Sequence, residues 1–267
     1  MSGAPPAALA ERHGHVLVIT INRPEARNAV NGAVSTAVGD AVQEAQDNPD
    51  IRAVVLTGSG DSTFCAGADL KAIALRENIF HAQRPEWGFA GYVQHFIDKP
   101  TIAAVNGAAL GGGTALALAS ALAGAVQNAE FGLPEVKRGL IAAAGGVFRI
   151  VEQLPRKVAL EMLFTGQPIT ADDAFKWGLI NRVVPAGQGN PALEAALALA
   201  ERIAGNAPLA VQASKRVAVG ADDGTVTGDQ SGWLRTMREI VPIMRSEDAK
   251  EGPRAFVEKR QPVWKGR

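Results

Sequence analysis

Three consecutive glycines, Gly111 to Gly113, stand in front of a run of alanine and leucine in the stretch LGGGTALALA. Glycine lets a backbone approach a ligand closely. The first N–H groups of a following helix have no partner within the helix and carry the positive end of its dipole. The pattern therefore predicts a site for an anion, or for a carbonyl oxygen that gains negative charge, where this helix begins.

A second turn of small residues, in FCAGADLK (residues 64–71), also precedes a predicted helix, with Asp69 in its opening turn. Two backbone N–H groups from two such turns can hold one carbonyl oxygen and stabilise it as an enolate or a tetrahedral oxyanion. Taken alone, the small residues of each turn are explained by a tight entry into a helix as well as by an oxyanion hole. Together with a nearby acid, the two turns indicate an oxyanion hole.

The candidate acid is Glu135, in the stretch FGLPEVKRGL. A carboxyl group beside an oxyanion hole can remove a proton next to a carbonyl and return it. From the residues alone an alternative stays open, because Glu135 follows Pro134 and an acid in the first turn of a helix is favoured by the helix dipole.

Other chemistries lack their motifs. The four histidines are scattered at positions 13, 15, 81 and 95, and neither HExxH nor CxxC occurs, so we expect no metal site. GxGxxG, GxxxxGK[ST] and GxSxG are also missing. The one cysteine, Cys65, has no evident catalytic partner and is predicted to be a small buried residue. We therefore expect neither a separate cofactor nor covalent catalysis by the protein.

Composition excludes further classes of function. Basic and acidic residues both number 27 in a chain of 267, so no overall charge favours nucleic acid or a membrane surface. The single cysteine and the lack of a signal-peptide pattern in the first 15 residues predict a cytoplasmic protein. The uncharged run at 101–126 is mostly alanine and glycine, and is expected to form a buried strand, turn and helix rather than a membrane span.

Strands and helices alternate along the chain. Apolar runs at 15–24, 52–60 and 101–107 read as strands, a helical pattern follows Asn31, and the glycine motif opens a helix expected to reach about Leu122. Two further helices are predicted at 155–166 and 169–179, and a short strand at 181–185. This alternation predicts an α/β fold. We expect a core at residues 1–190 and a mostly helical region at 191–267.

Six segments together resemble the successive signatures of the crotonase superfamily, the enoyl-CoA hydratases and isomerases: FCAGADLK, AAVNGAALGGG, AEFGLPEVKRGL, AAGGVFRI, LTG and ITADDAFKWGLINRVVP. The resemblance runs from about residue 16 to 260. It implies a spiral core of repeated ββα turns, a helical trimerisation region, an acyl-CoA substrate, and a homotrimer or dimer of trimers. Coenzyme A enters only as part of the substrate.

The resemblance also assigns roles to residues. The oxyanion donors fall on the backbone N–H groups of Ala68 and Gly112, and the acid/base on Glu135. The family's contacts to coenzyme A fall on two loops and on the last helix, reached from a neighbouring subunit: Arg27, Ala29, Ala66, Asp69, Leu70, Phe256 and Lys259. For Arg27 and Lys259 the alternative is a solvated charge, and for Phe256 a helix-packing role. Residues 73–96 are expected to border the acyl pocket.

The sequence departs from the family at the water site. Hydratases of this family generally use two glutamates, and the position of the second is Ala115, which cannot exchange a proton. Near the acyl end of the pocket, Ala142 and Ala143 replace proline and glycine. In the strand after the glycine-opened helix, Ala121 stands where the family often has an acid. Three hypotheses follow: an enoyl-CoA hydratase, a double-bond isomerase that uses Glu135 alone, and a catalytically weak acyl-CoA-binding protein.

Overall fold

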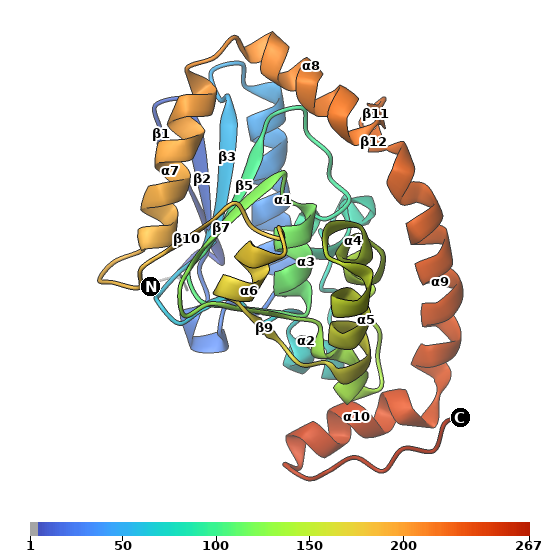
Figure 1. Cartoon of the computed structure of the whole chain (residues 1–267). Coiled ribbons are helices and arrows are strands. Elements are labelled where there is room, and N and C mark those ends of the chain that lie inside the picture. Colours follow the sequence, from blue (N-terminus) through green and yellow to red (C-terminus); the bar gives the residue numbers. More distant parts are fainter. Residues whose placement is uncertain (1–4) are drawn as a thin grey trace.

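The computed structural model describes residues 5–267, so the first four residues of the segment without a signal-peptide pattern lie outside it. Its larger sheet has six strands in the order β1-β2-β3-β5-β7-β10 (Figure 1). β1 and β2 form an antiparallel hairpin, and the other neighbours are parallel. The strands are β1 (Ala8–His13), β2 (Val16–Ile21), β3 (Ala53–Gly58), β5 (Thr101–Val105), β7 (Leu122–Val126) and β10 (Arg182–Val184).

A second sheet of shorter strands has the order β4-β6-β8-β9. Its strands are β4 (Thr63–Cys65), β6 (Ala108–Leu110), β8 (Glu130–Gly132) and β9 (Ile169–Thr170). The chain passes from β3 to β4, from β5 to β6 and from β7 to β8, so each turn of the spiral adds one strand to each sheet. The first two turns end in α2 (Leu70–Ala74) and α3 (Gly112–Ala119). The predicted α/β fold of repeated ββα turns is confirmed.

The larger sheet lies between two helices, α1 (Gly32–Asp47) on one face and α7 (Pro191–Ala204) on the other (Figure 1). α1 begins where the predicted pattern does, because the Asn31 side chain accepts a hydrogen bond from the Val34 N–H at 3.1 Å. α7 buries an alanine at every fourth position, which places small side chains on one face and lets the helix pack closely on the strands.

The prediction that the glycine-opened helix reaches about Leu122 is wrong, because α3 ends at Ala119. Ser120 has an extended backbone, and its hydroxyl is hydrogen-bonded to the Tyr92 hydroxyl at 2.8 Å. Leu122 then begins β7, which pairs with β5. Pairing within the sheet has overridden the helical preference of the alanine and leucine run. The helices predicted at 155–166 and 169–179 are confirmed as α5 (Arg156–Thr165) and α6 (Ala171–Lys176).

Beyond α7 the chain forms α8 (Pro208–Val219), α9 (Gln230–Arg245) and α10 (Glu247–Val257). α9 was not predicted as a separate helix. In Figure 1, α8 and α9 follow one margin of the molecule and α10 crosses beneath it. No helix of residues 5–267 is long and apolar enough to span a membrane, and the uncharged run at 101–126 forms β5, β6, α3 and β7, as predicted.

Asn28 fastens the loop that leads into α1. Its side chain is fully buried, accepts a hydrogen bond from the Arg23 N–H at 3.1 Å, and donates to the carbonyl oxygens of Ser59 at 2.9 Å and Thr63 at 2.8 Å. Its φ of +53° is one that asparagine adopts more readily than most residues. This loop is therefore tied to the connection between β3 and β4.

Asn28→Ala is expected to lower the free energy of unfolding by about 2 kcal/mol, because buried polar groups lose their partner. Urea denaturation would measure the loss. Asn206→Ala is the matched control, since the exposed Asn206 side chain donates only to Arg202 in the preceding turn. Equal losses in the two variants would contradict the role of Asn28.

Candidate active site

The two glycine-containing turns predicted from the sequence meet in the structure. At Gly67, whose φ is +94°, a Cβ atom would lie 3.2 Å from the Gly112 nitrogen and 3.1 Å from the Leu110 oxygen. The next residue, Ala68, and Gly112 each have an N–H that donates to no atom within residues 5–267. The structure thus places two unused backbone donors on touching turns.

Glu135 approaches the same place from η4 (Pro134–Arg138), a short 3₁₀ helix after β8. Its Oε1 lies 3.2 Å from the position a Cβ would take on Gly111, which is the residue before α3. Its Oε2 is buried and has no hydrogen-bond partner in the described chain. Burial raises the pKa of Glu135 to about 7. The carboxyl group therefore titrates near neutrality, where it can both accept and donate a proton.

Each residue of the glycine triplet makes a different close contact. Gly111 has a φ of +56° and leaves room for the Glu135 carboxyl. A Cβ on Gly112 would overlap the ring of Phe89, and one on Gly113 would overlap the Cys65 oxygen in β4. From the sequence, the glycines are expected to let a ligand approach the backbone. The structure adds that neighbouring protein groups also require them.

Phe89 is a site residue that the sequence analysis did not single out within the segment 73–96. It begins η3 (Phe89–Gly91) and is almost fully buried. Just before it, Trp87 stacks on His95 with 3.8 Å between ring centroids and packs closely on Gly39 of α1. Burial lowers the pKa of His95 to about 4, so its imidazole is neutral and serves packing. The sequence signal that could have drawn attention to Phe89 was the presence of glycines on both sides of it.

Backbone hydrogen bonds join the two loops expected to contact coenzyme A. The Ala66 N–H donates to the Arg27 oxygen at 3.1 Å, the Val30 N–H to the Gly67 oxygen at 2.9 Å, and the Asp69 N–H to the Val30 oxygen at 2.9 Å. The structure therefore brings one group of predicted residues together: Arg27, Ala29, Ala66, Asp69 and Leu70. The Arg27 side chain is exposed.

The Asp69 carboxylate is occupied by the protein. It caps α2 by accepting hydrogen bonds from the N–H groups of Lys71 at 3.0 Å and Ala72 at 3.3 Å, and it pairs with the Arg23 guanidinium at 2.9 Å. Burial raises the pKa of Asp69, but the bond from Arg23 and the helix N–H groups together more than offset burial and hold the pKa below its ordinary value. Asp69 therefore fixes the loops.

The other two predicted coenzyme A residues lie elsewhere. Phe256 is in α10, half exposed, with its ring centroid 4.2 Å from the Arg138 guanidinium carbon at the end of η4. Lys259 is exposed and lies two residues beyond α10, which ends at Val257, whereas the resemblance placed Lys259 within the last helix. The structure brings Phe256 to the segment that carries Glu135 rather than to the joined loops.

The possible metal ligands and the one thiol lie as follows. In the part of the chain that the structure describes, no three histidine, cysteine, aspartate or glutamate side chains are grouped to hold a metal ion. Cys65 is fully buried, as predicted, and burial raises the pKa of its thiol to about 12. The thiolate required of a nucleophile is therefore scarce at neutral pH.

The fold and these residues define an enzyme family. The sequence matches the enoyl-CoA hydratase/isomerase family over residues 11–267, and the chain belongs to that family. It is 42% identical over 259 residues to carnitinyl-CoA dehydratase of Salmonella heidelberg (strain SL476), with 96% of this chain and 97% of the relative covered.

Two solved structures show the same relationship. Carnitinyl-CoA hydratase from Mycobacterium avium is 70% identical, with a TM-score of 0.96 and coverage of 99% of this chain and 100% of that chain. Enoyl-CoA hydratase from Mycobacterium tuberculosis H37Rv is 43% identical, with a TM-score of 0.76 and coverage of 98% and 100%. The predicted superfamily is confirmed, and the chain is an acyl-CoA enzyme of the enoyl-CoA hydratase type.

Gly112→Ala is expected to lower kcat/KM by about tenfold to a hundredfold, because the new methyl group displaces either the Phe89 ring or the Gly112 N–H. Steady-state kinetics with a 2-enoyl-CoA would measure the loss. Gly228→Ala is the control, since a Cβ there meets nothing within 4 Å. Adding Phe89→Ala should restore part of the activity, and full activity in Gly112→Ala alone would show that the contact is unimportant.

Glu135→Gln is expected to stabilise the protein at pH 8 more than at pH 5. The raised pKa means that the native state binds more protons than the unfolded state between about pH 4.5 and 7, so the stability contributed by Glu135 is lost as pH rises through this window. The difference between the two pH values should approach an upper limit of about 3 kcal/mol. Chemical denaturation at both values would test it, and a pH-independent effect would contradict the raised pKa.

Proposed function

We propose that the chain adds water to, and removes water from, the C2–C3 bond of an acyl-CoA thioester, with the N–H groups of Ala68 and Gly112 as the oxyanion hole and Glu135 as the acid/base. The observation that carries this proposal is the meeting of two unused N–H groups with a buried carboxyl group whose pKa is about 7. Such donors stabilise charge that develops on a carbonyl oxygen.

One carboxyl group can complete the reaction. The thioester oxygen accepts hydrogen bonds from Ala68 and Gly112, which makes C3 electrophilic. The Glu135 carboxylate takes a proton from water while the water oxygen bonds to C3, and the thioester becomes an enolate. The protonated carboxyl group then returns the proton to C2. The buried, unpartnered Oε2 supports this role, because nothing in the described chain competes for its proton.

Ala115 favours a second candidate function, double-bond isomerisation. Ala115 is buried in the first turns of α3, and its N–H donates to the Gly111 oxygen at 3.1 Å. Residues four apart lie on one face of a helix, so a side chain at position 115 would lie on the same face as Gly111, which is the face toward Glu135. With only a methyl group there, Glu135 alone would move a proton between C2 and C4 of a 3-enoyl-CoA. A catalytically weak acyl-CoA-binding protein is the remaining alternative.

Binding of coenzyme A is proposed at the joined loops, through Arg27, Ala29, Ala66, Leu70 and the backbone of Asp69. Phe256 and Lys259 are proposed to reach the coenzyme A of a neighbouring subunit in a homotrimer or a dimer of trimers. Apolar side chains exposed on α8 and α9 support such an assembly: Leu209, Val217, Leu234, Met237, Val241 and Met244. No cofactor beyond the coenzyme A of the substrate is needed. A cytoplasmic location fits the single reduced thiol.

The names of the Salmonella and Mycobacterium avium relatives suggest the first acyl group to test. We include carnitinyl-CoA among the proposed substrates, beside straight 2-enoyl-CoA and 3-enoyl-CoA thioesters of several lengths. The absorbance of the conjugated thioester follows each reaction, because hydration removes the conjugated double bond, whereas dehydration and isomerisation create it.

Glu135→Gln should abolish turnover, by a factor of about a hundred or more, while acyl-CoA still binds. In the wild type, kcat/KM should rise with pH around a midpoint near 7, because the carboxylate is the form that accepts a proton. Loss of absorbance from 2-enoyl-CoA would support hydration, and a gain from 3-enoyl-CoA alone would support isomerisation. Activity that is identical in Glu135→Gln and wild type would refute the role of Glu135.

A further inference from the structure

Two neighbouring elements pack closely on the segment that carries Glu135, at positions where glycine leaves room for them. On one side Gly166, at the end of α5, lies so close to η4 that its Cβ would be 3.2 Å from the Pro134 Cα. On the other side α10 presses on the end of η4, where a Cβ on Gly252 would overlap the Arg138 backbone and one on Gly139 would overlap the Asp248 oxygen. A displacement of α10 therefore acts directly on η4.

The surface by which α10 packs on the body of the protein is made mostly of small residues. It buries only small residues, Ala249, Gly252 and Ala255. Of its larger apolar side chains, Phe256 is half exposed and lies over the Arg138 guanidinium of η4, whereas Val257 is 78% exposed. A helix with so small a packing surface gains little of its stability from the body of the protein.

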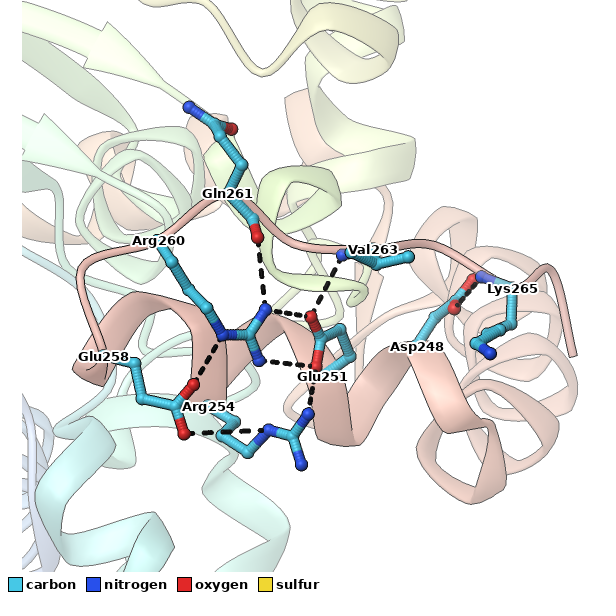
Figure 2. Close-up of polar contacts among 8 residues, drawn as sticks. All are labelled: Asp248, Glu251, Arg254, Glu258, Arg260, Gln261, Val263 and Lys265. Carbon is cyan, nitrogen blue, oxygen red and sulfur yellow. Dashed lines mark hydrogen bonds and ion pairs between the residues drawn. The ribbon is translucent and has the colours of Figure 1, made fainter.

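The chain after α10 folds back along the helix and forms hydrogen bonds and ion pairs with it (Figure 2). The Arg260 guanidinium pairs with Glu251, and Glu251 also accepts hydrogen bonds from Arg254 Nη2 at 2.9 Å and from the Val263 N–H at 3.0 Å. Glu258 pairs with Arg260 on the other side. The Glu251 side chain is only 11% exposed, so these bonds are partly shielded from water.

The contacts between the tail and α10 continue to the end of the chain. The N–H groups of Lys265 and Gly266 donate to the Asp248 carboxylate at 2.6 and 2.9 Å, and the Arg267 oxygen accepts from the Glu247 N–H at 2.7 Å. The tail thus spans α10 from Glu251 to its first residue. The bond from Arg260 to Glu251, followed by the Val263 N–H, lowers the pKa of Glu251 to about 2, which keeps it charged.

We propose that the C-terminal tail, residues 260–267, is a positioning element for Glu135: its bonds brace α10 as a helix, and α10 packs on η4, which holds Glu135 against the start of α3. This inference rests on the proposed role of Glu135 as the acid/base. Glu251 and Gly252 are then positioning residues: Glu251 binds the tail, and Gly252 transmits the contact to Arg138. Loosening either contact should let water reach the Glu135 carboxyl group and should move this group away from the start of α3.

The test uses the full-length chain with Glu251→Gln and Gly252→Ala. Both should lower kcat by about fivefold or more and move the pH midpoint of kcat/KM from about 7 toward the ordinary glutamate value by about half a unit or more. The pH midpoint distinguishes this role from substrate binding. A lost contact of Phe256 or Lys259 with coenzyme A would raise KM but would leave the midpoint unchanged. Should Gly252→Ala fail to fold, Glu251→Gln decides alone.

Two substitutions serve as matched controls. Glu239→Gln changes an exposed glutamate in α9, and Gly228→Ala adds a methyl group that meets nothing within 4 Å. Both should keep the wild-type profile. A wild-type midpoint and kcat in folded Glu251→Gln would overturn the inference while the loss of activity in Glu135→Gln still stands. Full activity in Glu135→Gln would instead overturn the proposed function.

Discussion

The close approach of Gly67 to the start of α3 is the constraint on which the site depends. An N–H group can serve a ligand only if no protein acceptor occupies it, and two such groups must also point to one place. Glycine at position 67 permits the positive φ that brings its turn against the start of α3. A Cβ atom on Gly67 would lie 3.2 Å from the Gly112 nitrogen. The second sheet brings the turns together, since its neighbouring strands β4 and β6 lead one to each turn.

Much of the fold could be predicted from the sequence. Strands such as β3 and β5 are buried along their whole length and therefore appear as continuous apolar runs. The start of α1 after Asn31 and the end of α5 next to Gly166 agree with the helix ends predicted from the sequence. The second sheet gave no such signal, because strands of two or three residues are too short to show a period, and its existence was implied only by the resemblance to a family.

The site divides in the same way. Glu135 and the two turns could be found because each belongs to a local motif. That Oε2 would lack a partner, and that the pKa would rise to about 7, depends on packing between distant segments. The glycines around Phe89 do not reveal that its ring meets Gly112, because this contact joins positions far apart in the chain, and Phe89 was therefore missed. Asp69 was placed in the correct turn, but its pairing with Arg23 required the folded loops.

The position of Cys65 gives the enzyme an internal reporter. Its carbonyl oxygen lies against Gly113, its side chain is fully buried, and it is the only thiol in the sequence. A thiol reagent can reach it only when the structure around β4 opens. The rate of labelling would therefore report how often the region that carries one of the two donor turns opens, in an unmodified chain and without an introduced probe.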